Sequence, residues 1–398
     1  MPQAQRAPKG MRRRGGAAGE ELPQGDHPAE TDSEENDMVP PRQKHMTPEM
    51  AAEIRAEAEK GDAESQSRLG DLYRFGAGVK SDIAEAIRWY SAAVEQGSGS
   101  GMARLGRCYE LGSGVRRDHE KAEDLYIRSA DLGCAEGMDR LAEMYLRGRG
   151  KKGTKEDSVK WYLKSAEKGS VHAMFWLGTL AENGLVSEPD FAEAAKWYQA
   201  AADHGQYVAG FHLGLLLEEG KGVAQDFGKA AELYRKAADE GVADAAFRLG
   251  ALYEKGNGVP KDPAEAMKWY RKSAESNSKA MQSIGEMYLN GTGVPADPKE
   301  AVSWFSMAAD NGSWEAEIRL GDLLSDEKGP AYDKEKAIEW YRKATEHGDV
   351  YAQYRLGCLY ETETGLERQM ECLKWYSMAA RNGNSEAKKH LMALGFSA

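Results

Sequence analysis

The sequence has few cysteines and no long apolar run. Only four cysteines occur in 398 residues, at positions 108, 134, 358 and 372, and no two of them form a CxxC pair. A disulfide framework is therefore not expected, and we predict reduced thiols in a cytoplasmic protein. No stretch of 18 apolar residues is present, which argues against a membrane-spanning helix. The basic N-terminal block is not followed by the apolar segment of a standard secretory signal.

The chain also lacks an excess of basic residues and any recognisable reaction centre. It contains 53 basic and 65 acidic residues, a formal net charge of -12, which argues against nucleic acid as the partner because phosphate binding needs a basic surface. Phosphate-binding, zinc-protease and serine-hydrolase motifs are missing from any supporting context. The eight histidines are scattered, and no nucleophile stands beside an oriented base. We predict a protein that is not an enzyme and has no metal or cofactor.

Residues 1–46 differ in composition from the rest of the chain. They contain Pro, Gly and charged residues but almost no aromatic or β-branched ones, a composition typical of disorder. A basic block around residues 6–14 precedes an acidic block at 20–37. We interpret this segment as a solvated, disordered tail; a docking or targeting arm is the alternative.

The remainder of the chain is built from one repeated pattern. A Leu-Gly or Ile-Gly step recurs with a period of 36 residues, with one step of 35. A fixed period of 20–50 residues is the signature of a stacked repeat array, and we count nine units over residues 61–382. The repeated glycines are Gly70, Gly106, Gly178, Gly214, Gly250, Gly285, Gly321 and Gly357, and Ala142 takes the place of glycine in the third unit.

Each unit is predicted to be a pair of helices. The first helix carries A-x-x-x-L-G-x-x-Y and ends in a glycine turn, which in five units reads Gly-x-Gly-Val and supplies the left-handed residue that closes a helix. A polar residue then caps the second helix: Asp82, Asp118, Thr154, Asp190, Asp226, Asp262, Asp297 or Asp333. Two of these caps, Asp82 with Glu85 and Asp262 with Glu265, resemble capping boxes. The ninth unit lacks both signals, and we expect a looser connection there.

A glycine inside a helix costs roughly 0.5–1 kcal/mol relative to alanine, so its recurrence needs a reason. The second helix carries paired aromatic residues such as Trp269-Tyr270. We expect the missing β-carbon at Gly250 and its equivalents to let the second helix approach closely, with Trp or Tyr covering the bare backbone. One hairpin cannot bury its apolar face, so neighbouring units stack. The predicted fold is an all-α, right-handed α-α superhelix (solenoid), with capping helices at 47–60 and 383–398.

At these residues the sequence resembles the SEL-one-like repeat family, relatives of the tetratricopeptide repeats. The match is carried by residues 246–275, AFRLGALYEKGNGVPKDPAEAMKWYRKSAE, and their eight copies. The resemblance implies an α-solenoid that acts as an adaptor or scaffold. Cysteine-rich members of the family are linked to β-lactam binding or hydrolysis, but this chain lacks their regular cysteine pattern.

Two columns on the first helices are candidates for partner binding. One contains Phe175, Phe211 and Phe247; the next contains Trp176, His212 and Arg248, and continues as arginine in most other units. In related arrays the first column points into the concave groove. An apolar strip flanked by arginines suits a peptide with apolar anchors and acidic flanks. Two alternatives stay open here: the phenylalanines pack between neighbouring first helices, and the arginines pair with local Glu and Asp.

The leading functional hypothesis is a non-catalytic scaffold or adaptor that holds a protein or peptide partner in its concave groove. Two other hypotheses stay open. The first is β-lactam or peptidoglycan-type ligand binding or hydrolysis, as in the cysteine-rich relatives. The second is a secreted effector that acts as an adaptor on host proteins. The sequence leaves the oligomeric state undetermined.

Overall fold

The computed structural model describes residues 46–396, so the predicted disordered segment 1–46 lies outside the described residues except for its last residue. The described chain forms 20 helices: α1 (Pro48–Glu59), α2 (Ala63–Phe75), α3 (Ile83–Glu95), α4 (Gly99–Leu111), α5 (His119–Asp131), α6 (Ala135–Leu146), α7 (Lys155–Glu167), α8 (Val171–Asn183), α9 (Phe191–Asp203), α10 (Tyr207–Glu219), α11 (Phe227–Asp239), α12 (Ala243–Lys255), α13 (Pro263–Ser273), α14 (Ser278–Asn290), α15 (Pro298–Asp310), α16 (Trp314–Ser325), α17 (Lys334–Glu346), α18 (Val350–Glu361), α19 (Leu366–Arg381) and α20 (Ser385–Ala393).

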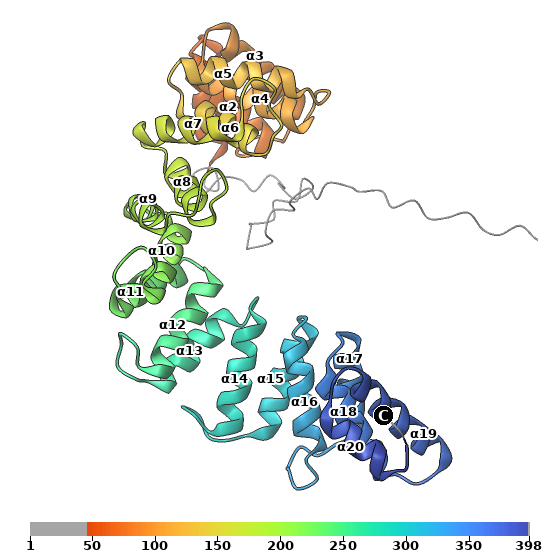
Figure 1. The fold of residues 1–398 in the computed structure, drawn as a ribbon. Helices are drawn as coiled ribbons and strands as arrows, with labels where there is room; N and C mark the ends of the chain where they lie inside the picture. Colours follow the sequence, from red (N-terminus) through yellow and green to blue (C-terminus); the bar gives the residue numbers. More distant parts are fainter. Residues whose placement is uncertain (1–45, 397–398) are drawn as a thin grey trace, which may run out of the picture.

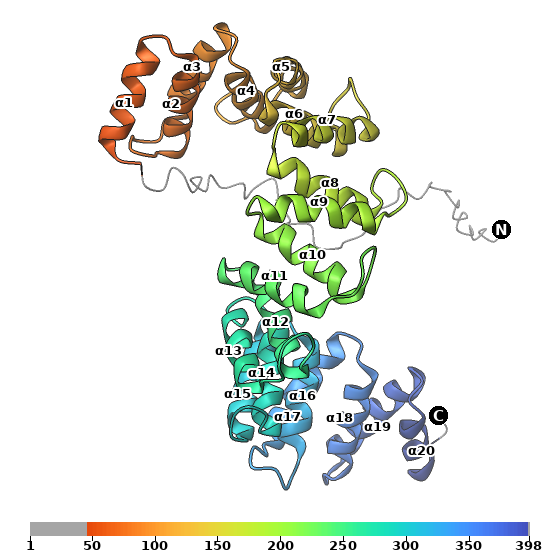
Figure 2. The same ribbon diagram turned by 90° about the vertical axis from the view of Figure 1, so that its left-hand side faces the viewer.

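The helices stack in chain order into a curved array. Nine hairpins run from α2–α3 to α18–α19, while α1 packs on α2 and α20 packs on α19 at the two ends. The array bends into an arc, with α9 and α11 on its outer side and α8 and α10 further inside (Figure 1), and α1 and α20 lie at opposite ends (Figure 2). The predicted all-α solenoid is confirmed.

The predicted caps begin the second helices. Asp82, Asp118, Asp190 and their equivalents stand at the N-cap, and each side chain accepts a hydrogen bond from a backbone N–H of the first turn. These bonds satisfy donors that a helix start leaves unpaired. Gly256 closes α12 with φ 80°, the left-handed conformation expected of the Gly-x-Gly-Val turn. The short turns fix the angle at which each second helix returns along its partner.

Two local predictions are wrong. Asp262 caps α13, but no reciprocal bond from Glu265 completes a capping box, because the Glu265 carboxylate accepts hydrogen bonds from Lys268 and Trp269 instead. Asp82 likewise lacks a reciprocal bond. A complete capping box is present at Thr154 and Asp157.

The connection of the ninth hairpin differs from the others, as its missing turn and cap signals predict. Only residues 362–365 separate α18 from α19. The start of α19 has no side-chain cap; Gly365, with φ 110°, occupies the N-cap. The polar turn of the other hairpins is replaced here by a longer second helix of 16 residues.

The glycine column and the second aromatic of each pair form the core of the hairpins. A β-carbon at Gly250 would lie 2.7 Å from the ring of Tyr270, and one at Gly214 would lie 2.5 Å from the ring of Tyr234. Both tyrosines are almost completely buried. The tyrosine, rather than the tryptophan before it, covers the bare backbone, and close packing against the ring repays the helix propensity lost at glycine.

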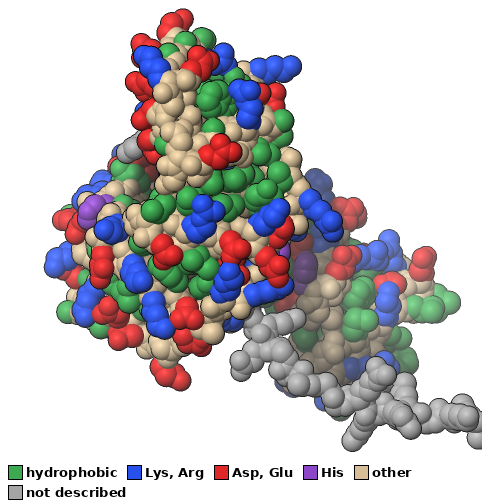
Figure 3. Space-filling view, turned by 90° about the horizontal axis from the view of Figure 1, so that it is seen from above, with side chains coloured by type: hydrophobic (Ala, Val, Ile, Leu, Met, Phe, Trp, Pro, Cys, Tyr) green, Lys and Arg blue, Asp and Glu red, His purple; other side chains and the backbone are tan. Residues whose placement is uncertain are grey.

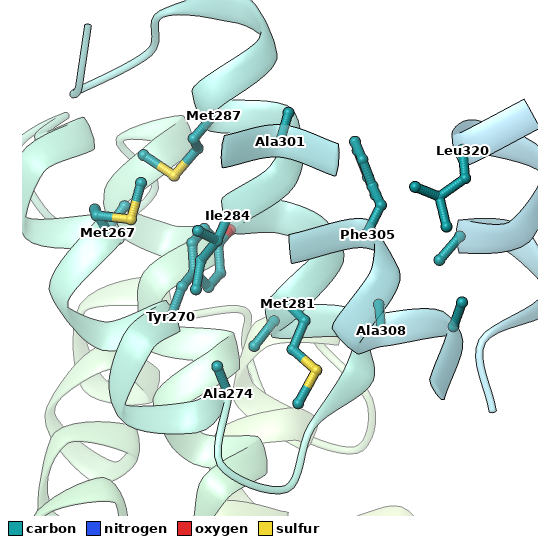
Figure 4. Packing of buried hydrophobic residues seen from close by; sticks show 14 of the residues in the cluster. Met267, Tyr270, Ala274, Met281, Ile284, Met287, Ala301, Phe305, Ala308 and Leu320 are labelled. Atoms are coloured by element: carbon teal, nitrogen blue, oxygen red, sulfur yellow. The ribbon is translucent and has the colours of Figure 1, made fainter. Parts of the chain in front are cut away.

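Core packing continues from one hairpin to the next. Tyr270 of the sixth hairpin belongs to the same apolar cluster as Ile284 of the seventh and Leu320 of the eighth, and these side chains bridge the stacked helices (Figure 4). The four cysteines are free. Within the described chain, no helix combines the length and apolar character needed to cross a membrane.

Candidate functional site: the inner wall of the arc

The first helices of the hairpins form the inner wall. Beyond neighbours in sequence, α2 contacts α4, α4 contacts α6, α16 contacts α18 and α18 contacts α20, all towards the two ends of the array. In its middle, α8 and α10 lie further inside than α9 and α11 (Figure 1). Contacts between first helices of successive hairpins are expected on the side of an arc with the shorter radius. Side chains that leave these helices away from the core therefore line a concave surface.

The three predicted phenylalanines lie on this wall in equivalent places. Phe175, Phe211 and Phe247 are half-buried, on α8, α10 and α12. Each ring packs on the core tyrosine of its own hairpin, with centroids 6.0, 5.8 and 5.7 Å apart. One part of each ring thus contributes to the core, and the other part stays accessible on the inner wall.

The second predicted column lies beside the first. Trp176 stacks on Tyr162 with an interplanar angle of 8°, and His212 stacks on Tyr198 at 5.1 Å. The structure joins most of the predicted residues into one strip, since the Phe175 ring lies 6.2 Å from Trp176 and 5.9 Å from His212. Arg248 extends the strip onto α12.

Arg248 and its equivalents take part in a recurring polar arrangement, which we call the Tyr–acid–base contact. A tyrosine of the second helix donates to a carboxylate on the first helix of its own hairpin. A base on the first helix of the next hairpin, or on α20 in the case of the ninth hairpin, lies within 4.0 Å of that carboxylate. The described residues include these five sets: Tyr90–Asp71–Arg104, Tyr198–Glu182–His212, Tyr234–Glu218–Arg248, Tyr341–Asp322–Arg355 and Tyr376–Glu361–His390.

These contacts change the expected charge of the wall. The arginine column was predicted to attract acidic flanks of a peptide, but Arg104 lies 2.9 Å from Asp71 and Arg319 lies 2.6 Å from Glu286. Their charges are largely neutralised within the chain. Acidic and basic side chains are also interspersed on the face of the molecule seen from above (Figure 3). The structure therefore agrees with the alternative prediction, in which the arginines pair with nearby Glu and Asp side chains.

Burial and hydrogen bonding shift the pKa values of the carboxylates in this arrangement. Burial raises the pKa of Asp71 to about 6, against the opposing effects of Arg104 and the hydrogen bond from Tyr90. Burial would also raise the pKa of Glu182, but hydrogen bonds with His212 and Tyr198 lower it below its usual range. Burial, together with the neighbouring Glu182, raises the pKa of the Tyr198 phenol.

Sequence reasoning missed a hollow further along the wall. A cavity of ≈ 640 Å³ opens between α12, α14 and α16, and it is lined by Phe247, Glu254, Lys279, Ser283, Trp314 and Glu315 among others. Trp314 is 42% exposed. The signal in the sequence was the serine at position 283, which interrupts the column otherwise occupied mainly by arginine.

Within residues 46–396, no group of three His, Cys, Asp or Glu side chains is placed to hold a metal ion. The inner wall instead offers aromatic surface, paired charges and one hollow, which are features suited to binding another molecule.

Comparison with known protein families shows to which family this chain belongs. The Sel1 repeat family matches nine times in succession, at residues 63–98, 99–134, 135–170, 171–206, 209–242, 243–278, 278–313, 314–349 and 350–384. The chain belongs to the Sel1 repeat family, and so to the α-solenoid proteins. Sel1 repeat proteins are generally protein-interaction scaffolds.

Two solved structures resemble the chain over most of its length. One is a protective antigen present in uropathogenic Escherichia coli strains, with 30% identity, a TM-score of 0.74, and coverage of 87% of this chain and 76% of the other. The second is a Sel1 repeat protein from Oxalobacter formigenes, with 31% identity, a TM-score of 0.57, and coverage of 76% and 88%. No curated protein matches the chain.

Proposed function

We propose that this protein is a non-catalytic adaptor that holds a protein or peptide partner on the inner wall, across α8, α10, α12, α14 and α16. The observation that carries the proposal is the strip of half-buried Phe175, Trp176, Phe211 and His212, whose rings lie next to one another. Phe247, the equivalent residue of the next hairpin, lines the hollow beside Trp314. Aromatic side chains that are partly accessible and held rigidly by the core supply apolar contact at low entropic cost.

The surroundings of the strip favour a protein partner over nucleic acid. Acidic residues outnumber basic ones in the chain, and Arg248 lies 3.7 Å from Glu218 rather than standing free. A phosphate backbone would need unpaired cations. We place the protein in the cytoplasm, because its four cysteines are free and thiols persist in reducing compartments.

A photo-cross-linker placed on each side of the array tests this proposal. Val208 on the inner wall is 39% exposed, and Lys268 on a second helix has a 74% exposed side chain. Each is replaced in turn by p-benzoylphenylalanine in the full-length protein, which is then irradiated in cells that naturally contain it. We expect a discrete protein adduct from position 208 and not from position 268. Equal adducts from both positions, or none from position 208, would refute inner-wall binding.

A further inference from the structure

The sixth hairpin has two members of the Tyr–acid–base contact and lacks the third. Tyr270 donates a 2.6 Å hydrogen bond to Glu254, as Tyr234 does to Glu218 in the fifth hairpin. In the fifth hairpin Arg248 reaches the carboxylate from the next first helix. The equivalent residue after Glu254 is Ser283, whose side chain is too short and carries no charge. Among the described residues, no cation forms an ion pair with Glu254.

The seventh hairpin lacks the tyrosine hydroxyl but keeps an acid that is paired with a base. There Phe305 replaces the tyrosine and Leu289 stands at the position of Glu254, while Glu286, at the position that Asp71 and Asp322 hold in their hairpins, pairs with Arg319 at 2.6 Å. Phe305 is fully buried and packs beside Gly285 as the tyrosines do beside their glycines. The ring can therefore be buried without the hydroxyl, and the carboxylate that the seventh hairpin keeps has its base. The sixth hairpin keeps both hydroxyl and carboxylate and leaves the carboxylate without a base.

The absence of a base at position 283 leaves both an open space and, within the described chain, an unpaired carboxylate, that of Glu254. The hollow of ≈ 640 Å³ opens at Ser283 and has Glu254 in its lining. Three carboxylates and one lysine, Lys279, line it. Glu286 is neutralised by Arg319, at 2.6 Å, and Lys279 forms no ion pair with Glu254 in the described structure. One net negative charge therefore remains in a recess that also contains aromatic surface.

We propose that this hollow receives an arginine side chain of the protein partner, whose guanidinium pairs with Glu254 in the place that Arg248 takes beside Glu218. This inference rests on the proposed function and specifies the chemistry of the partner. The planar guanidinium suits the site because it can pair with a carboxylate through two N–H groups. It can also lie against the face of an aromatic ring, which Trp314 and Phe247 supply in the lining.

The hydrogen bond from Tyr270 prepares the carboxylate for this role. It engages one oxygen of Glu254 and leaves the second oxygen able to accept from a ligand. A carboxylate held in place before binding loses less conformational entropy when the partner arrives. An uncharged partner side chain would leave Glu254 without a counter-ion and gain little from the recess.

The experiment uses the full-length protein labelled with 5-fluorotryptophan and observed by fluorine NMR. The resonance of Trp314, one of nine tryptophans, is assigned with the Trp314→Phe variant. The probes are N-acetyl-arginine amide and its uncharged isostere N-acetyl-citrulline amide. We expect a saturable shift of the Trp314 resonance with the arginine probe, and at least about tenfold weaker binding of the citrulline probe.

Two variants at one position make the test specific. Ser283→Arg supplies the missing base from within the chain and should weaken binding of the arginine probe at least about tenfold. Ser283→Ala is the matched control, which keeps the hollow open and should leave the affinity within about twofold. Equal binding of both probes, no saturable shift, or unchanged binding by Ser283→Arg would overturn the inference. Failure of this experiment while position 208 still cross-links would leave the proposed function standing.

Discussion

A β-carbon added at Gly250 would lie 2.7 Å from the ring of Tyr270, closer than real β-carbons approach a neighbour. The ring is buried and belongs to an apolar cluster shared with the next hairpins, so it has little room to move. The contact explains why a residue that weakens a helix recurs at the same place in eight of nine hairpins, and it gives the first prediction.

Gly250→Ala should destabilise the protein. The added methyl group overpacks the core and should lower the free energy of unfolding by about 1–3 kcal/mol. The higher helix propensity of alanine offsets this loss by about 1 kcal/mol. The matched control is Gly228→Ala on α11, where the added β-carbon would have its nearest contact at 3.4 Å, with Asp226. Urea unfolding followed by circular dichroism should show a lower midpoint for the first variant and an unchanged or higher midpoint for the second. The opposite order would contradict the packing explanation.

Removing the phenolic hydroxyl should have different effects in two hairpins. Tyr198 donates a 2.6 Å hydrogen bond to Glu182, whereas the buried Tyr162 hydroxyl has no hydrogen-bond partner in the described structure. Tyr198→Phe should cost about 1–2 kcal/mol, because a partly buried carboxylate loses a donor. Tyr162→Phe should be neutral or stabilising. The two variants are compared by thermal unfolding, and equal losses of stability would argue against the hydrogen-bond assignment.

Titration of Asp71 should lower the free energy of unfolding as the pH rises from about 4 to about 6. Its folded-state pKa is raised to about 6 by burial, above its ordinary value near 4, so the folded protein holds this proton more tightly than the unfolded chain. Below about pH 4 the protonated carboxyl group contributes its full stabilisation of the folded state. This contribution is lost as the pH rises to about 6, and above that pH the free energy of unfolding no longer changes because of Asp71. The difference in unfolding free energy between wild type and Asp71→Asn should decrease across this range, by at most about 3 kcal/mol. A difference that does not change with pH would refute the raised pKa.

The aromatic strip should be required for partner capture. Replacing Phe175, Phe211 and Phe247 together with leucine keeps apolar volume against the core tyrosines but removes the flat ring faces of the inner wall. We expect the photo-adduct from position 208 to fall at least about tenfold, with the helical circular dichroism unchanged. Leu132→Ser, at a residue that is 59% exposed after α5, is the control and should leave the adduct intact. An undiminished adduct in the triple variant would exclude the strip.

Local patterns predicted local structure well. The aspartates before the second helices and the glycines after the first helices act within one turn of their own position, so neighbouring residues define their role. The capping box expected at Asp262 is absent for an equally local reason. Lys268 and Trp269, only three and four residues away, donate hydrogen bonds to the Glu265 carboxylate that the box would need. Sequence spacing alone does not decide such a competition between side chains.

The candidate site was predicted only in part. Periodicity placed Phe175, Phe211 and Phe247 in one column, since a repeated unit brings equivalent positions to the same face. It did not show that Arg319 and Arg104 are paired with acids of the preceding hairpins, because those acids are about 33 residues away in sequence. The hollow beside Trp314 is lined by three successive hairpins, and its one trace in the sequence is Ser283, which interrupts the arginine column but does not by itself indicate a cavity.

The sequence by itself determined the repeat, the helix pairs and their ends, because each depends on contacts within a few residues or on exact recurrence along the chain. Only the tertiary structure decided which charges remain unpaired and where the inner wall is hollow. Glu254 and Glu218 occupy the same place in their hairpins, and what distinguishes them is a side chain on the first helix of the next hairpin. Electrostatic pairing and cavity shape are properties of helices brought together by stacking, so they emerge only when the hairpins pack.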